Sequence, residues 1–583
     1  MRFFLKNTQT LIGSWISIIA FFITLVALFI YPNITQSQDV FAIYDPLSVP
    51  NNKFGIHIIQ ATIDESSPAA QLVNTNGDWG YITVLIEAKD KNQGKWQEFF
   101  NDLRRRHLIP IVRLATIPEG NIWKRPDIGE ASVWADFLDS LNWPTKNRYV
   151  VIYNEPNHGT EWGGTVDPKN YAEVLDQTAA ALKSKNRDFF VLNAGFDASA
   201  PSQPPNYEDQ ISFMRQMEVA VPGIFNKLDG WVSHSYPQPN FAGSPTASGR
   251  GTVRTYVWEL QQLRQFGVTK SLPVFITETG WKHSEGKVRN VSFPNPEDLS
   301  GYFQNAFQNA WNNIRIVAIT PFLLSYQDVP FDHFSFKKYK SNEFYPHYLA
   351  IKTLPKVAGK PIQDKLAMLT KGEIYSAIVS GEAYDISLTF KNTGQSIWYP
   401  STSSGQVRLV PLEGGKELGI NSVEIPGNVK IEPGGEYTFN LKVKAPDTGS
   451  FKVVLNLFEG QTPFDSKPFE FKTEVKSPVI LQVKSVLKWK KSSKGEYLLR
   501  IEGAVGESVQ KVYINENGES AKEEARYLLP EYTFDFSLEK PFYNTKTISQ
   551  KLKSGENILD FGELAPNIFE ILIHPITFFK GEN

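Results

Sequence analysis

Two hydrophobic patterns divide the chain, and the first one fills residues 51–361. There, short apolar runs alternate with longer segments of helical periodicity, and consecutive runs begin 27 to 44 residues apart. Each interval has room for one helix and two loops, as in repeated strand–helix units. The runs expected to be buried strands are Phe54–Ile59, Tyr81–Glu87, Leu108–Leu114, Tyr149–Glu155, Phe189–Ala194, Gly230–Tyr236, Pro273–Glu278 and Val317–Leu324.

Eight strand–helix units in one segment predict a (β/α)8 barrel, with a doubly wound open sheet as the alternative. Two of the expected helices carry a start signal, Asp167-Pro168 and Asn295-Pro296. Aspartate or asparagine caps the first N–H groups of a helix, and proline fits the first turn because no hydrogen bond is lost there. These dipeptides therefore predict helices that begin at Pro168 and Pro296.

The second pattern begins at about residue 362, where apolar and polar positions alternate with period two. The segments AYDISLTF, EYTFNLKV and SFKVVLNLF follow it, and turns such as IEPGGE and APDTGS separate them. This predicts an antiparallel β-sandwich over residues 362–476. Within it, FKNTGQSIWYP at 390–400 resembles the tryptophan-bearing Ig-like module found beside many extracellular enzymes. Residues 477–583 are predicted to form a further β-rich domain, which serves as a spacer or packs against the barrel, with sugar binding as the alternative.

The N-terminus carries 21 consecutive residues without a charge, Leu11–Tyr31. A helix of that length, at roughly 1.5 Å per residue, spans a bilayer core of about 30 Å. Arg2 and Lys6 precede it, so the positive-inside rule puts the short N-terminal tail in the cytoplasm and the rest of the chain outside. A single-pass anchor in the cell membrane is therefore expected. A cleaved signal peptide, which would release the chain, is the alternative.

The expected domain organisation follows from these patterns. Its parts are the cytoplasmic tail 1–10, the transmembrane anchor 11–31, a linker 32–50, the barrel 51–361, the Ig-like sandwich 362–476 and the C-terminal β-rich domain 477–583.

Composition narrows the partners and the chemistry. Lysine plus arginine total 60 and aspartate plus glutamate total 62, so no strongly basic surface for nucleic acid is expected. Cysteine is absent, which excludes disulfides, thiolate metal sites and cysteine nucleophiles. The metalloprotease motif HExxH and the serine hydrolase motif GxSxG are absent as well.

Two glutamates stand at the ends of expected strands, where a barrel of this kind carries its active site. Asn154 and Glu155 end the fourth strand, and Glu278 ends the seventh. The glutamates are 123 residues apart, or three units of about 41, so their strand ends face each other across the barrel mouth. Carboxyl groups about 5–5.5 Å apart are the arrangement that cleaves a glycosidic bond with retention. Pro156 is expected to keep the backbone of Glu155 extended.

The same segments resemble a known enzyme family. YNEPNHGTEWGGTVDPKNYAEVL and PVFITETGW resemble the retaining glycoside hydrolases of clan A, most of all family 39 and next family 5, over roughly residues 50–355. The resemblance implies that Glu155 is the general acid/base and that Glu278 is the nucleophile. It also implies that Asn154 binds the 2-hydroxyl of the sugar at the cleavage point, and that Tyr236 hydrogen-bonds the nucleophile.

Other residues are candidates for substrate binding. Arg113 is expected to orient Glu278 and keep it ionised, and His234 to contact the sugar or the acid. A purely structural role in the barrel mouth is the alternative for both residues and for Tyr236. The further candidates are His57, Trp162, Trp281 and Tyr326.

Core packing is an equal alternative to sugar stacking for Trp162 and Trp281. The eighth strand departs from the clan, because TPFLLSYQD has no tryptophan at its end. Phe322 or Tyr326 is the expected replacement as a sugar platform.

These features together predict a membrane-anchored, extracytoplasmic retaining glycoside hydrolase that acts on β-linked poly- or oligosaccharides. No metal or organic cofactor is expected, because two carboxyl groups and water suffice for the reaction. A catalytically silent carbohydrate-binding or envelope scaffold protein is one alternative. A transglycosylase that uses the same two glutamates is the other.

Overall fold

The computed structural model describes residues 43–401, 405–503 and 506–580. The predicted membrane segment 11–31 lies outside these residues, and none of the helices within them is long and apolar enough to cross a bilayer. The chain divides into two compact units, residues 1–362 and 363–583, and each is described by itself.

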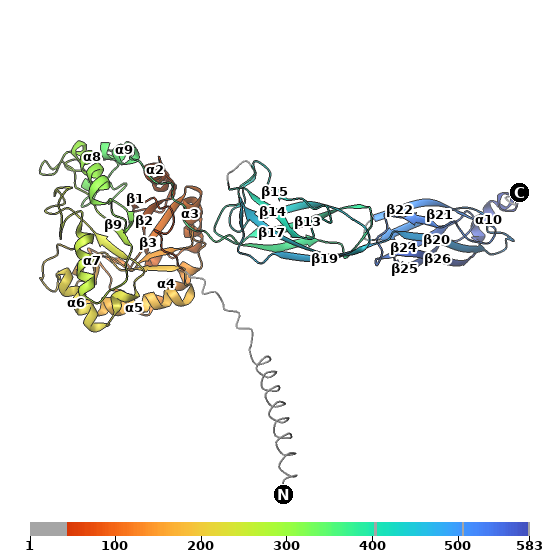
Figure 1. Cartoon of the computed structure of the whole chain (residues 1–583), viewed down its shortest axis with the longest axis horizontal. Coiled ribbons are helices and arrows are strands. Elements are labelled where there is room, and N and C mark those ends of the chain that lie inside the picture. Colours follow the sequence, from red (N-terminus) through yellow and green to blue (C-terminus); the bar gives the residue numbers. More distant parts are fainter. Residues whose placement is uncertain (1–42, 402–404, 504–505, 581–583) are drawn as a thin grey trace, which may run out of the picture. The chain divides into compact units, whose positions relative to one another are not determined.

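The first unit contains eight parallel strands, one for each apolar run singled out in the sequence (Figure 1). Several are shorter than expected, and the fourth ends at Val151, four residues before Glu155. The strands are β1 (Gly55–Ile58), β2 (Gly80–Glu87), β3 (Leu108–Ala115), β6 (Arg148–Val151), β7 (Phe189–Leu192), β8 (Trp231–His234), β9 (Val274–Glu278) and β10 (Ile316–Ile319).

The eight strands close into a barrel. Hydrogen-bonded pairing runs β1-β2-β3-β6-β7 in one sheet and β8-β9-β10 in the other, and every pair is parallel. Parallel bridges join the two sheets at both edges, Leu192 to Gly230 and Phe54 to Ile319. Closure excludes the doubly wound open sheet.

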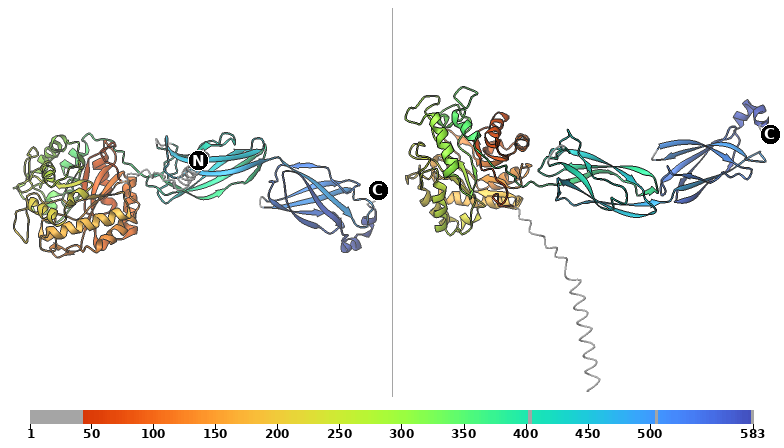
Figure 2. Two further views of the ribbon diagram at one scale, coloured as in Figure 1. Left: turned by 60° about the horizontal axis from the view of Figure 1, so that its bottom comes forward. Right: turned by 45° about the horizontal axis from the view of Figure 1, so that its top comes forward.

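Helices follow the strands along the chain and lie on the outside of the barrel (Figures 1 and 2). The helix start at Pro168 is confirmed, because the Asp167 carboxylate accepts a hydrogen bond from the backbone N–H of Asn170 at 3.0 Å. The start at Pro296 is confirmed by a reciprocal capping box between Asn295 and Asp298. The helices are α2 (Ile63–Asn74), α3 (Gln93–Arg105), α4 (Glu130–Asp139), α5 (Pro168–Lys185), α6 (Gln210–Ala220), α7 (Thr255–Gln265), α8 (Pro296–Asn305) and α9 (Pro346–Lys352).

Short elements complete the first unit. The β4–β5 hairpin (Pro118–Glu119 and Ile122–Trp123) follows β3, and a π-helical turn, η4 (Ala306–Ala310), extends α8. The 3-10 turns are η1 (Ala88–Asp90), η2 (Gly159–Glu161), η3 (Ile224–Lys227) and η5 (Asp332–Phe334).

Apolar side chains from alternating strand positions fill the barrel interior. Tyr149 is central among them, with its ring centroid 5.1 Å from that of Phe190 and 5.2 Å from that of Phe275. A separate, larger hydrophobic core lies between the strands and the helices. Because the barrel interior is filled with apolar side chains, polar side chains at the carboxyl ends of the strands can extend only toward the barrel mouth.

The second unit contains two β-sandwiches with separate hydrophobic cores. In the first sandwich, burial alternates along β13 and β16, which explains the period-two pattern in the sequence. Trp398 of the Ig-like motif is fully buried there and packs against Phe464. The strands of this sandwich are β11 (Ala367–Glu373), β12 (Ala377–Val379), β13 (Ala383–Asn392), β14 (Val407–Glu413), β15 (Val423–Glu424), β16 (Glu436–Lys444), β17 (Gly449–Glu459), β18 (Thr462–Pro463) and β19 (Phe469–Lys476).

The second sandwich pairs a three-stranded sheet with a four-stranded one. Its strands and terminal helices are β20 (Val479–Leu487), β21 (Gly495–Gly503), β22 (Gly506–Ile514), β23 (Glu523–Ala525), β24 (Thr533–Glu539), β25 (Lys546–Lys551), β26 (Gly555–Leu564), α10 (Ile568–Ile573) and α11 (Pro575–Lys580).

Candidate active site

A cavity of about 400 Å³ lies at the carboxyl ends of the barrel strands. Its wall combines ionisable groups with a set of aromatic rings, the composition expected of a small-molecule site. The polar lining residues are Glu87, Arg113, Thr116, Asn154, Glu155, His158, Glu161, Asp197, Tyr236 and Glu278. The aromatic lining residues are Trp123, Tyr153, Phe241, Phe322, Tyr326, Phe331 and Phe334.

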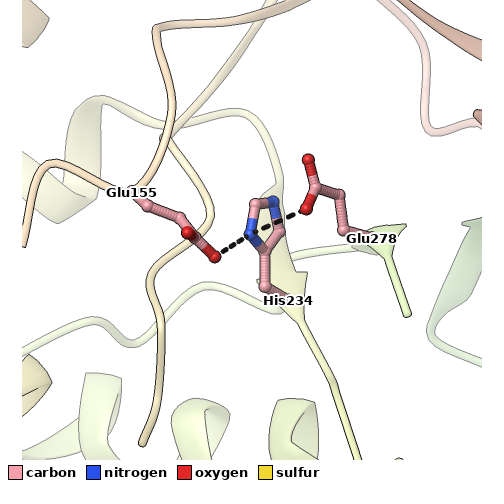
Figure 3. A group of neighbouring side chains, drawn as sticks. All are labelled: Glu155, His234 and Glu278. Carbon is pink, nitrogen blue, oxygen red and sulfur yellow. Dashed lines mark hydrogen bonds and ion pairs between the residues drawn. The ribbon is translucent and has the colours of Figure 1, made fainter. Parts of the chain in front are cut away.

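The two glutamates predicted from the sequence meet in this cavity on either side of His234 (Figure 3). His234 Nδ1 is 2.8 Å from Glu155 Oε1 and 3.7 Å from Glu278 Oε2. One oxygen of each carboxylate and one imidazole nitrogen all lie within 4.8 Å of one another. This separation is shorter than the about 6.5–9.5 Å at which a pair of carboxyl groups admits a reacting water molecule beside a bound substrate.

The segment that carries Glu155 differs from the expectation for a residue before proline. The backbone of Glu155 has a φ of +29°, and that of Tyr153 has a φ of +68°. The backbone of this segment therefore turns through the left-handed region at both residues and is not extended at Glu155. Its N–H donates to Gly195 O at 3.1 Å, and its carbonyl accepts from His158 N at 2.8 Å. These tertiary contacts and the tight turn outweigh the local preference set by Pro156. Non-glycine residues at positive φ store strain, which is common at functional sites.

Glu278 at the end of β9 is surrounded by donors. Arg113 Nη1 donates to its Oε1 at 2.5 Å, and the Tyr236 hydroxyl donates to its Oε2 at 3.1 Å. Burial alone would raise the pKa of the Glu278 carboxyl, but the positive charges of His234 and Arg113 lower that pKa below its ordinary value. Glu278 is therefore held ionised, as a nucleophile must be.

Arg113 connects the two glutamate-bearing segments. The same Nη1 that reaches Glu278 also donates to Asn154 Oδ1 at 2.7 Å. The amide oxygen of Asn154 is thereby occupied, and its amide nitrogen is oriented away from Arg113. The guanidinium thus fixes the side-chain orientation of Asn154 as well as the charge of Glu278.

The pKa values of the two histidines near the glutamates are shifted in opposite directions. Burial favours the neutral form of His234, but the Glu278 and Glu155 carboxylates raise its pKa. Burial lowers the pKa of His57 to about 3, with the charge of Arg113 acting in the same direction. His57 is therefore neutral. It is buried next to Glu278, with its Nε2 3.9 Å from Glu278 Oε1.

Three of the residues proposed from the sequence to bind substrate lie away from the cavity. His57, Trp162 and Trp281 are fully buried and are not among its lining residues. The Trp162 indole donates to Asn170 Oδ1, and the Trp281 indole donates to Gly243 O. Both tryptophans belong to the barrel's hydrophobic core, so the stacking role is corrected to core packing.

The other proposed residues do meet at the cavity. Arg113, Asn154, Tyr236 and Tyr326 line it, while His234 lies beneath and reaches Glu155. Phe322, three residues after the end of β10, also lines the cavity. Its ring is edge-on to that of Phe331, with the ring centroids 5.2 Å apart. Both residues expected to replace the absent tryptophan, Phe322 and Tyr326, therefore lie at the cavity.

Several cavity residues were not singled out in the sequence. Glu87 ends β2. The rule that a barrel of this kind carries its active site at the carboxyl ends of the strands therefore applies to Glu87 as well. Glu161 lies in η2, inside the motif that suggested the family, but nothing local marks it as facing the cavity. His158 and Asp197 form an ion pair at 2.9 Å across two loops, and Trp123 reaches the cavity from the β4–β5 hairpin.

Glu155, His234 and Glu278 also have the spacing of a three-ligand cation site. The chemistry of the surroundings disfavours that use. Arg113 already supplies a positive charge 2.5 Å from Glu278, and a divalent ion in the same corner would be repelled by it.

The arrangement suits a specific kind of chemistry. An ionised carboxylate and a second carboxyl group within 4.8 Å can attack an anomeric carbon and protonate the departing oxygen. The aromatic rings of the wall supply flat apolar faces on which a sugar ring can stack.

No family model matches the chain, and no curated protein matches it. Solved structures with a similar fold include a family 39 glycoside hydrolase from the gut symbiont Bacteroides cellulosilyticus WH2, a GH5_18 from Bifidobacterium longum subsp. infantis and a GH113 beta-1,4-mannanase. In the same order, their sequence identities to this chain are 13%, 12% and 12%. The matched regions cover 69%, 57% and 52% of this chain, and 82%, 83% and 97% of the respective solved structures. The TM-scores are 0.38, 0.37 and 0.32. Families 39 and 5 are the two that the sequence motifs resemble.

Proposed function

We propose that the chain is a retaining glycoside hydrolase that cleaves β-glycosidic bonds in a poly- or oligosaccharide. The observation that carries the proposal is the pair of carboxyl groups, Glu155 and Glu278, with oxygens within 4.8 Å of each other in one cavity. Retaining enzymes hold these groups about 5–5.5 Å apart, whereas inverting enzymes need about 6.5–9.5 Å to admit a water molecule.

In the first step the Glu278 carboxylate attacks the anomeric carbon, and the bond to the leaving oxygen breaks. Glu155 gives its proton to that oxygen, and a glycosyl ester forms on Glu278. In the second step a water molecule attacks the same carbon, Glu155 takes a proton from it, and the ester bond to Glu278 breaks. Two inversions give net retention.

The neighbours of the glutamates support this assignment of roles. Arg113 and the Tyr236 hydroxyl donate to Glu278 and hold it ionised and oriented. His234 reaches the other glutamate with its Nδ1 and positions Glu155 Oε1. Asn154, held by Arg113, is placed beside Glu155 to contact the 2-substituent of the sugar, as the resemblance implies.

The setting that we propose for this activity is extracytoplasmic, with the chain anchored in the cell membrane by residues 11–31. The uncharged length of that segment and the charges before it support the proposal. Fractionation of full-length protein tests it: the chain should stay with membranes after a high-salt wash. A soluble form that begins near residues 33–40 would instead indicate a cleaved signal peptide.

The decisive test of the activity is a panel of polysaccharides and activated aryl β-glycosides, followed by NMR of the first product formed. We expect turnover with the β configuration retained. Glu278→Gln should abolish turnover, while Glu297→Gln, a matched change at an exposed glutamate of α8, should leave it intact. Product of inverted configuration, or full activity in Glu278→Gln, would contradict the proposal. Sugar transfer to an added acceptor in place of hydrolysis would favour the transglycosylase, and binding without turnover would favour the silent scaffold.

A further inference from the structure

The cavity contains five carboxyl groups, and four of them have a cationic partner. The partner nitrogens lie 2.5–2.9 Å from the carboxyl oxygens, so each of these four groups has a basic side chain beside it. The pairs are Glu87 with Lys89, Glu155 with His234, Asp197 with His158 and Glu278 with Arg113.

Glu161 is the exception. Among the described residues it forms no ion pair, and the side chain of Asn154 is near enough to lower its pKa. The positive charge of Arg113 lowers the pKa of Glu161, but that guanidinium is already shared between Glu278 and Asn154. Burial, together with the negative charges of Glu155 and Glu278, raises the pKa of Glu161 to about 7. A carboxyl group in this state readily gives up its proton to an entering cation.

We propose that the cavity takes a sugar that carries a cationic amino group, and that Glu161 is the counter-ion of that group. The inference rests on the proposed function, in which Asn154 contacts the 2-substituent of the sugar at the cleavage point. Because Asn154 and Glu161 line the same cavity and interact with each other, the group at the same position of the sugar lies next to both. The substrate class is therefore a 2-amino-2-deoxy sugar in a β linkage.

The chemistry of the reaction gives Glu161 a task that a neutral sugar would not need. An ammonium group on C2 withdraws electrons from C1 and destabilises the oxocarbenium-like transition state. A carboxylate in contact with the ammonium offsets this effect, and more strongly in a partly buried cavity than in water. Conversely, a uronic acid would place a further negative charge among five carboxyl groups, so acidic sugars should be rejected.

The test uses activated aryl β-glycosides of the gluco and galacto series that differ only at C2, with an amino, a hydroxyl or an acetamido group. We expect the wild-type kcat/KM to be highest for the amino compound. Glu161→Gln keeps the size and polarity of the side chain but removes the charge. It should lower kcat/KM for the amino compound by about 30-fold, the loss expected when one partner of a buried charge pair is removed. The value for the hydroxyl compound should change only a few-fold.

Equilibrium binding provides a readout that does not depend on turnover. Glucosamine oligosaccharides should bind Glu278→Gln protein more tightly than glucose oligosaccharides of the same length. The added Glu161→Gln change should remove that difference. Glu87→Gln, in the same cavity but at a carboxylate with its own lysine, should leave the difference in place.

The outcomes separate this inference from the proposed function. Cleavage of hydroxyl sugars in preference to amino sugars, or an amino preference that survives Glu161→Gln, overturns the inference and leaves the glycosidase intact. Glu161-dependent binding of amino sugars without any turnover supports the inference and contradicts the glycosidase. Equal binding of both kinds of oligosaccharide overturns the inference as well.

Discussion

Gly195 makes room for the imidazole of His234. A Cβ atom at Gly195 would lie 2.1 Å from His234 Cδ2 and 2.3 Å from its Nε2, closer than any real Cβ contact. The carbonyl of the same glycine accepts the backbone N–H of Glu155 at 3.1 Å. One glycine after β7 therefore contacts the histidine and also the backbone of Glu155, the proposed general acid/base.

The first prediction concerns that glycine. Gly195→Ala should displace the His234 ring, because the ring is buried on all sides and the alanine methyl group cannot be avoided. Loss of the Glu155–His234 contact should lower kcat/KM by about 10²-fold, the cost of a displacement of about 1 Å in an active site. Steady-state kinetics measures this loss in kcat/KM. Gly301→Ala is the matched control, since a Cβ there meets nothing within 4 Å.

A double variant distinguishes displacement of the histidine from general damage. If Gly195→Ala acts through His234, it should add little to the effect of His234→Ala. Additive losses would show that the glycine acts by another route.

The second prediction separates the roles of the two glutamates. Glu155→Ala should lose about 10²–10⁴-fold in activity on substrates with poor leaving groups and much less on activated aryl glycosides, which need no proton to depart. Azide should restore turnover and give a β-glycosyl azide. Glu278→Ala should be inactive on both substrate types, because no glycosyl ester can form.

Labelling provides an independent check of the nucleophile. A 2-fluoro activated sugar should modify wild-type protein on Glu278, as identified by peptide mass. A label on Glu155 would reverse the assignment.

The third prediction concerns the acid limb of the pH profile. The charges of His234 and Arg113 hold the pKa of Glu278 below its ordinary value against the effect of burial. Arg113→Met removes one of these charges, so the pKa of Glu278 should rise and the acid limb of kcat/KM should move to higher pH. Arg113→Lys keeps the charge and should shift the limb less. An acid limb that stays in place in Arg113→Met would contradict the ion pair.

The fourth prediction concerns stability at acid pH. His283 lies in the loop between β9 and α8, His347 lies in the first turn of α9, and both are buried. Burial lowers the pKa of His283 to about 4 and that of His347 well below its ordinary value. In the unfolded chain both have a pKa near 6.5, so below pH 6.5 the unfolded state binds more protons. The free energy of unfolding should therefore fall as the pH drops from about 6.5 to 4, by about 1.4 kcal/mol per pH unit for each histidine.

Thermal unfolding between pH 7 and pH 4 measures this effect. His347→Phe removes one titrating group within an aromatic cluster that contains Phe303 and Phe336, and it should make the decline shallower. His574→Gln, a change at an exposed histidine between α10 and α11, should leave the slope as it is. An unchanged slope in His347→Phe would show that other groups control acid stability.

The fifth prediction is that chelation leaves activity unchanged. The trio Glu155, His234 and Glu278 has the spacing of cation ligands, but Arg113 provides the counter-charge. Assays with and without EDTA, and with added divalent ions, should give the same kcat/KM. Loss of activity in EDTA, restored by one specific ion, would assign the trio to a metal.

The sequence by itself determined the barrel and the two glutamates. The periodicity of the hydrophobic positions and the spacing between apolar runs can both be read from the local sequence. Eight apolar runs alternate with helical segments, and parallel strands separated by helices can bury their apolar runs only in a sheet whose outer face the helices cover. Glu278 ends β9, and Glu155 follows β6 by four residues, so their place at the barrel mouth follows from the order of elements. Alternation with period two likewise indicated the sandwiches, since it is a direct consequence of strand geometry.

Only the tertiary structure decided which side chains face the cavity. Trp162 and Trp281 follow the two glutamates closely in sequence, yet both are buried in the core, while Glu161, one residue before Trp162, reaches the cavity. The φ of +29° at Glu155 depends on the carbonyl of Gly195, which lies 40 residues away. Loop residues have no period that would assign them to a face. Their orientation, and the charge that each ionisable group carries, is set by burial and by partners that are distant in the sequence.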